Sequence, residues 1–107
     1  MPIKVLSHFR GLGLGAVTDR YEVAIAADRG TILRRLHECF RPLGYTSVGH
    51  AYDGSYIFTF SPRHEIAVWI RKETLRFEDR FRPGLRLRIR QSQLRRKLPW
   101  IVAPLLG

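Results

Sequence analysis

The sequence predicts an α+β domain, in which one amphipathic helix packs on a curved antiparallel sheet of about five or six short strands. Three observations support this. A helical stripe of apolar residues lies ahead of the chain's midpoint, and segments of alternating apolar and polar residues follow it. Turn dipeptides such as Asp53-Gly54 and Pro83-Gly84 separate those segments. A strand, a helix and then a meander are typical of a helix laid across one face of a sheet.

The first predicted elements are two strands and the helix. Strands are predicted over Ile3–Phe9 and Tyr21–Ala27, the second with alternate residues facing a core. Asp28 stands at the position of a helix N-cap, and the helix should end near residues 41–43, where Pro42 disfavours its continuation. The buried stripe of this helix is predicted to be Ile32, Leu33, Leu36, Cys39, Phe40 and Leu43.

The remaining strands form the predicted meander, and the last two form a hairpin. They are expected around 46–52 and over Tyr56–Phe60, Glu65–Arg71, Thr74–Phe81 and Leu85–Arg90. Residues of equal parity share a face, so the hairpin turn should contain an odd number of residues, such as 82–84. The resulting cross-strand pairs are Arg80–Arg86, Glu78–Arg88 and Arg76–Arg90. Parity sends Asp79 inward, so we expect a β-bulge there, or otherwise a buried cation as its partner.

The length of the chain sets the domain organisation. With 107 residues, of which 45% are hydrophobic, the chain has the size of one domain and enough apolar surface for one core. We expect a single domain over 1–97 and an apolar C-terminal tail over 98–107. No apolar run is long enough to cross a membrane, and polar residues and glycines interrupt the N-terminal region where a signal peptide would lie. Together with a single cysteine, these features favour a cytoplasmic location.

Charge carries the functional prediction. The chain has 19 Lys and Arg against 9 Asp and Glu, a net charge of +10 that is concentrated in its second half. Such clustering favours a small basic module that binds a polyanion, foremost a nucleic-acid backbone, although a solvated sheet face would give the same pattern. The predicted polyanion-binding residues are Arg76, Arg80, Arg82, Arg86, Arg88, Arg90, Arg95, Arg96 and Lys97.

The apolar tail leaves a second function open. It either caps the core or acts, beside the basic residues, as an anchor for an anionic membrane or a partner protein. The alternative function is therefore an adaptor or assembly protein for an acidic partner or an anionic membrane surface. Its contact residues would be Trp100, Ile101, Val102, Leu105 and Leu106. Two prolines in this segment argue against a long helix.

Residues with catalytic or metal-binding spacing are not found. The glycines at 11, 13 and 15 lack the dinucleotide spacing, the four histidines lack metal-ligand spacing, and Cys39 lies on the apolar helical stripe. We therefore expect no cofactor, no metal and no catalytic residue. A third hypothesis is a small ligand-binding or enzymatic domain with its pocket between helix and sheet, lined by Leu36, Phe40, Phe58 and Phe60. Strand aromatics that are either core residues or base-stacking candidates are Tyr52, Tyr56, Phe58, Phe60 and Trp69.

Overall fold

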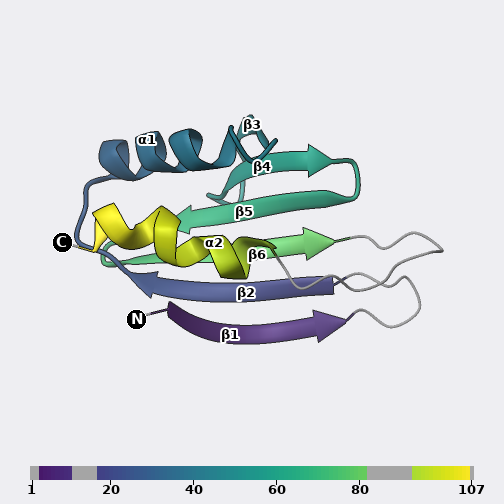
Figure 1. Ribbon diagram of the computed structural model, residues 1–107, viewed down its shortest axis with the longest axis horizontal. Helices are drawn as coiled ribbons and strands as arrows, with labels where there is room; N and C mark the ends of the chain where they lie inside the picture. Colours follow the sequence, from purple (N-terminus) through teal and green to yellow (C-terminus); the bar gives the residue numbers. More distant parts are fainter. Residues whose placement is uncertain (1–2, 11–16, 82–92, 107) are drawn as a thin grey trace.

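The protein is an antiparallel sheet with two helices. A computed structural model describes the backbone of residues 3–10, 17–81 and 93–106, and the side chains of residues 19–81 and 94–106. The described strands form one sheet in the order β1-β2-β6-β5-β4-β3 (Figure 1). They are β1 (Ile3–Arg10), β2 (Val17–Ala24), β3 (Thr46–His50), β4 (Tyr56–Ser61), β5 (His64–Ile70) and β6 (Thr74–Phe81). The helices are α1 (Arg29–Phe40) and α2 (Gln93–Val102), followed by the short 3-10 helix η1 (Ala103–Leu105). The predicted α+β class is confirmed.

One face of the sheet and both helices share a single core. Alternate residues of the central strands point toward the helices, as a period of two requires. β2 begins at Val17, earlier than predicted, but Tyr21, Val23 and Ile25 are buried as their alternation predicts. The core is made of Tyr21, Val23, Ile25, Ile32, Leu36, Cys39, Phe40, Tyr45, Phe58, Ile66, Val68, Leu75, Phe77, Leu94, Leu98, Ile101, Val102 and Leu105.

Helix α1 agrees with its prediction, except that Leu33 and Leu43 of the predicted buried stripe are only partly buried. It begins after Asp28, whose carboxylate accepts a hydrogen bond from the Thr31 hydroxyl. It ends at Phe40, and Gly44 follows with a φ of +95°, a left-handed conformation that glycine adopts without strain. A side chain at this position would also meet the ring of Phe60, because a Cβ would lie 3.0 Å from that ring.

Helix α2 joins the basic stretch to the apolar tail. It spans ten residues, of which 98–102 belong to the tail, and Pro99 lies inside it; the tail itself thus holds no long helix, as its prolines predict. Proline removes one backbone hydrogen bond, a cost that burial of an apolar stripe offsets. The stripe consists of Leu94, Leu98, Ile101, Val102 and Leu105, which repeat the i, i+4, i+7, i+8, i+11 spacing of α1. The helix also runs across the expected boundary between residues 97 and 98.

Strand β6 corrects the predicted hairpin. It pairs with β2 along one edge and with β5 along the other, so both hydrogen-bonding edges are occupied. The predicted cross-strand pairs of Arg76, Glu78 and Arg80 are therefore wrong, since no edge remains for them. The predicted strand Leu85–Arg90 and the turn 82–84 lie outside the described residues.

The β-bulge expected at Asp79 is also wrong. β6 pairs with both β2 and β5 without a register shift. Asp79 lies opposite Asp19 of β2 on one side and opposite Ile66 of β5 on the other. The side chain therefore does point inward, as parity predicts, and it is fully buried. The imidazole of His64 is one of its partners.

Candidate nucleic-acid interface

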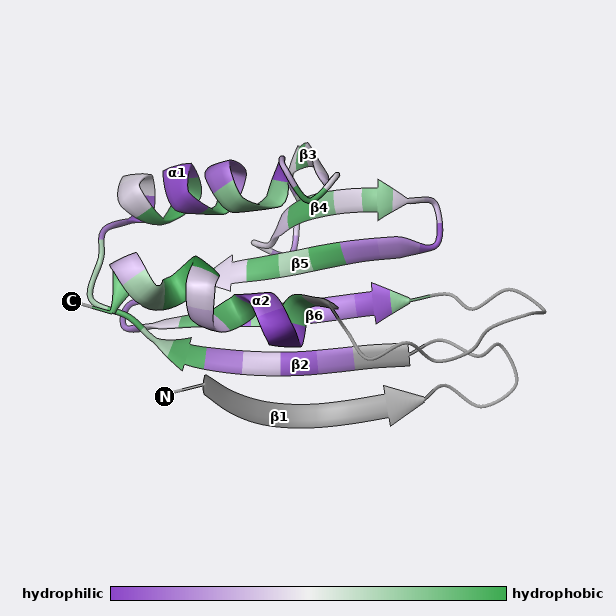
Figure 2. Ribbon diagram, viewed as in Figure 1, coloured by the Kyte–Doolittle hydropathy of each residue, from purple (hydrophilic) through white to green (hydrophobic). Residues whose placement is uncertain are grey.

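The sheet face turned away from the helices carries two predicted polyanion-binding residues, Arg76 and Arg80. Figure 2 shows hydrophilic residues along β2 and β6, the strands that supply much of this face. Strand β2 adds Arg20 and Glu22 to it, β5 adds Glu65, and β6 itself adds Glu78. The ion pairs are Arg20 Nε to Glu78 Oε2 at 3.2 Å, Arg80 Nε to Glu78 Oε1 at 2.8 Å, Arg80 Nη1 to Glu65 Oε1 at 3.7 Å, and Arg76 Nη2 to Glu22 Oε2 at 3.3 Å.

These pairs change the charge of the predicted arginine face. Three arginines meet three glutamates there among the described side chains, because Glu22 comes from β2 and Glu65 from β5. Counting the charges of β6 alone, as the sequence analysis does, leaves out both of these carboxylates. Arg80 also lies over the ring of Trp69, with its Cζ 5.7 Å from the ring centroid. Arg76 and Arg80 are thus held by neighbours on the sheet, and the described part of this face has no excess positive charge.

The excess charge of the described residues lies on the helical layer instead. Helices α1 and α2, with the residues directly flanking α1, carry seven cations and two carboxylates, Asp28 and Glu38. The strands and turns with described side chains carry six cations and seven carboxylates. The cations of the helical layer are Arg29, Arg34, Arg35, Arg41, Arg95, Arg96 and Lys97; all except the half-buried Arg35 are exposed. We call these seven residues the helix cations.

The helix cations include three of the predicted binding residues. Arg95, Arg96 and Lys97 lie in the first turns of α2, in the hydrophilic part of that helix (Figure 2). The cations of α1 were not predicted as binding residues, because the sequence showed them only as the polar side of an amphipathic helix. The other predicted binding residues, Arg82, Arg86, Arg88 and Arg90, lie outside the described residues.

The predicted contact residues of the tail differ in their exposure to solvent. Ile101, Val102 and Leu105 are buried in the core and Leu106 is half-buried, whereas half of the Trp100 surface is exposed. Arg35 of α1 fixes this end of α2, because it donates hydrogen bonds to the carbonyl oxygens of Trp100 at 2.7 Å and Ile101 at 3.0 Å. A cation at the carbonyl end of a helix also complements the helix dipole.

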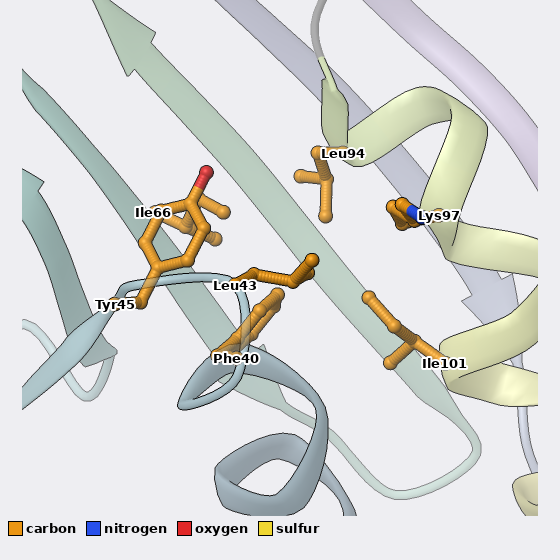
Figure 3. A pocket seen from close by; sticks show the side chains of 7 residues that line it. All are labelled: Phe40, Leu43, Tyr45, Ile66, Leu94, Lys97 and Ile101. Carbon is orange, nitrogen blue, oxygen red and sulfur yellow. The ribbon is translucent and has the colours of Figure 1, made fainter.

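The ligand pocket expected between helix and sheet is replaced by side-chain packing. Leu36, Phe40 and Phe58 are fully buried, and the rings of Phe40 and Phe58 lie 4.8 Å apart. Figure 3 shows the groove where the end of α1 faces α2, with Phe40 and Leu43 on one side and Leu94 and Ile101 on the other. These side chains leave no space for a water molecule in that groove.

A wider hollow opens on the surface beside the end of α1. It has a volume of about 400 Å³, and it is open to solvent rather than enclosed. Its lining includes the cation Arg41, which directly follows α1, hydroxyl groups from β3, and aromatic side chains. The lining residues are His37, Arg41, Tyr45, Thr46, Ser47 and Phe58. Guanidinium and hydroxyl groups are donors suited to phosphate, so this hollow continues the basic surface of the helices.

Buried carboxylates form a second polar feature, which sequence analysis found only in part. Asp19 and Asp79 face each other across β2 and β6, and both are buried. His64 Nε2 lies 2.6 Å from Asp79 Oδ1 and 3.4 Å from the hydroxyl of Tyr45. Burial, and then the charge of Asp79, raise the pKa of Tyr45 far above its ordinary value. The inward parity of Asp79 was the sequence signal. His64 was missed because the predicted strand began one residue later, at Glu65.

The candidate stacking aromatics lie in different environments. Phe58 is a core residue, and Trp69 is partly covered by Arg80. Tyr56 is stacked on His50 with ring centroids 4.4 Å apart, and its hydroxyl accepts a hydrogen bond from Arg29. Tyr52 is fully exposed in the β3–β4 turn, and Phe60 is about half exposed on β4. These strand aromatics do not form one continuous platform.

Comparisons with known proteins add no assignment. No family model, curated protein or solved structure matches this chain. Within the described side chains, no group of three or more His, Cys, Asp or Glu residues is arranged to hold a metal ion. Neither described helix is long and apolar enough to cross a membrane.

Proposed function

We propose that the protein is a small basic module that binds the phosphate backbone of nucleic acid through its helical layer. The observation that carries this proposal is the uneven distribution of charge among the described residues. Six exposed cations and half-buried Arg35 lie on or beside the two helices, while the arginines of the sheet face are paired with glutamates. Unpaired arginines suit phosphate because they present several donors and attract polyanions over a long range.

The proposal keeps part of the predicted binding set and replaces another part. Arg95, Arg96 and Lys97 remain in it and are joined by exposed cations of α1. Arg82, Arg86, Arg88 and Arg90 stay in it as a prediction from sequence, since they directly precede α2 in the chain. Arg76 and Arg80 leave it. A cytoplasmic location is part of the same proposal, and the single, buried Cys39 is compatible with that compartment.

The alternative, an adaptor for an anionic membrane or an acidic protein, is less favoured by the packing of the tail. Insertion into a membrane surface requires an apolar helix face, and the apolar face of α2 is already buried against the sheet. An acidic protein surface would contact the same helix cations. If that were the partner, the unmodified protein would show no salt-dependent binding of nucleic acid in the experiment below.

The test is a comparison of two triple variants that lose the same charge. Arg95→Gln/Arg96→Gln/Lys97→Gln removes exposed cations from α2, while the matched control Arg63→Gln/Arg71→Gln/Lys72→Gln removes exposed cations from turns and strand ends. Affinity for a labelled single strand and a labelled duplex is measured over a range of salt concentrations. We expect the α2 variant to lower the slope of log K against log salt by roughly 2 to 3, because each lost phosphate contact lowers it by about 0.7 to 0.9.

Two results would overturn the proposal. One is equal affinity and equal slope for the α2 variant and its control, which would make the location of the charge irrelevant. The other is the absence of salt-dependent binding to either nucleic acid by the unmodified protein. Thermal unfolding of both variants checks that their folds are intact.

A further inference from the structure

Trp100 is an exposed aromatic residue that lies close to several of the helix cations. Half of its surface is exposed, and among the described side chains it is the exposed large hydrophobic residue of the two helices; the others, Val48, Tyr52 and Phe60, lie on strands or in a turn. An isolated exposed apolar residue is common on protein surfaces. The contacts of Trp100 are what distinguish it.

The indole is held in place by Arg35. The guanidinium carbon of Arg35 lies 5.0 Å from the ring centroid, and the same guanidinium group donates hydrogen bonds to the carbonyl oxygens of Trp100 and Ile101. Because the guanidinium is anchored to the backbone, the cation–π contact restricts the ring orientation and covers one of its faces. The exposed part of Trp100, which is half of the residue's surface, is thereby presented to solvent at little further entropic cost.

Cations also lie one helical turn from the ring. Arg96 and Lys97 precede Trp100 by four and three residues, so their side chains lie on the same side of α2. Both are exposed, as is Arg34, which neighbours Arg35 on α1. An aromatic ring beside cations is the arrangement that binds a base and its adjoining phosphates in single-stranded nucleic acid.

We infer that Trp100 stacks on an unpaired base, so that the proposed ligand is single-stranded nucleic acid. This inference rests on the proposed function and deepens it. The base lies against the open side of the indole, opposite Arg35, while phosphates on either side of that nucleotide contact Arg96 and Lys97. In a duplex the faces of the bases are already stacked on one another, so a duplex gains only the phosphate contacts.

A membrane surface is the competing occupant of the same patch. Trp100 is the exposed member of an otherwise buried apolar set, since Leu98, Ile101, Val102 and Leu105 are fully or almost fully buried. One half-exposed indole supplies little apolar area for a lipid interface, whereas stacking of one base requires a single aromatic ring. The observations therefore favour the base.

The experiment uses the intrinsic fluorescence of Trp100. The chain contains two tryptophans, and Trp69 lies on the opposite side of the sheet beside Arg80. The Trp69→Phe variant therefore reports on Trp100 alone. It is titrated with a 12-nucleotide oligothymidylate, with a duplex of the same length, and with vesicles of mixed zwitterionic and anionic phospholipid. We expect quenching by the single strand and little quenching by the duplex.

A second measurement uses affinity. Trp100→Leu should weaken binding of the single strand about 5- to 20-fold, as loss of one stacked base does, and change duplex affinity less than twofold. Val48→Ala removes an exposed apolar side chain from β3 and serves as the control, with no expected effect.

The outcomes separate this inference from the proposed function. If binding depends on the α2 cations but Trp100 is not quenched and Trp100→Leu binds normally, stacking is wrong and the phosphate-binding function stands. A blue shift of Trp100 emission with vesicles, without quenching by the oligonucleotide, would assign the patch to a membrane and overturn the inference. If the unmodified protein binds neither nucleic acid, the proposed function fails and stacking fails with it. Quenching is measured with Trp100 in place, so it remains informative even if Trp100→Leu does not fold.

Discussion

His64 Nε2 lies 2.6 Å from Asp79 Oδ1, and Asp79 has no exposed surface. The imidazole is stacked on Phe81 with ring centroids 4.0 Å apart and is also close to Tyr45. A charged or polar side chain buried in a sheet is tolerated when hydrogen bonds replace its hydration. His64 is one such partner, and it is supplied by the adjacent strand β5.

Loss of this hydrogen bond should destabilise the fold. His64→Phe keeps an aromatic ring against Phe81 but removes the hydrogen bond to the buried carboxylate, so we expect a loss of about 1–3 kcal/mol in the free energy of unfolding. His64→Gln retains a donor and should lose less. Urea unfolding at neutral pH measures both variants. Equal stability of His64→Phe and the unmodified protein would show that this bond contributes nothing.

The ion pairs of the sheet face lead to a prediction about binding. Arg76 and Arg80 are paired with glutamates from three strands, so Arg76→Gln/Arg80→Gln should leave the salt dependence of nucleic-acid binding unchanged. Its affinity should fall less than threefold, through the lower net charge alone. Partly exposed ion pairs contribute little to stability, so the melting temperature should change by only a few degrees. A drop in the salt slope equal to that of the α2 variant would restore these residues to the binding surface.

The β3–β4 turn has a pH-dependent hydrogen bond. The buried hydroxyl of Ser55 donates to Asp53 Oδ1 at 2.6 Å, and the Ser55 backbone N–H donates to the same oxygen at 2.9 Å. These two bonds lower the pKa of Asp53 below its ordinary value of 3.8. A carboxyl group with a lowered folded-state pKa stabilises the fold above its unfolded pKa and loses that contribution as pH falls through the folded value.

The variant Ser55→Ala tests that contribution. It removes the larger of the two causes, so the pKa of Asp53 should rise toward 3.8, as measured by NMR titration of the side-chain carboxyl carbon. The stability difference between the variant and the unmodified protein should be larger at pH 7 than at pH 2. An unchanged pKa would show that the backbone N–H alone holds the carboxylate.

The C-terminal segment should be required for folding. Ile101 is fully buried in the core, so Ile101→Ala should cost about 2–5 kcal/mol, and deletion of residues 98–107 should abolish cooperative unfolding. Leu106→Ala, at a half-buried position, should cost clearly less and serves as the control. Circular dichroism during thermal and urea unfolding measures all three. A deletion variant that still unfolds cooperatively would show that the core does not depend on this segment.

Several features of the fold follow from local pattern alone. The spacing of Ile32, Leu36, Cys39 and Phe40 determines a helix with one buried face, and Asp28 and Gly44 mark its ends. Alternation determines which residues of β2 and β6 face the core, including the inward direction of Asp79. These features depend on neighbours a few residues apart, so a period of 3.6 or 2 is sufficient to predict them.

Tertiary structure decided what surrounds those residues. Strand order placed β6 between β2 and β5, which brought Glu22 and Glu65 to the arginines of β6 and left no edge for the predicted hairpin. It also placed His64 beside Asp79, fifteen residues away in the chain. Helix α2 formed because burial of Leu98 and Ile101 offset the cost of Pro99, and that burial exists only once the sheet has formed. The sequence by itself therefore determined helix α1, the strand faces and the net charge of +10. The pairing of strands and the packing of helices decided where the unpaired part of that charge lies. Strand pairing and helix packing depend on contacts between residues far apart in the chain, which a local pattern does not contain.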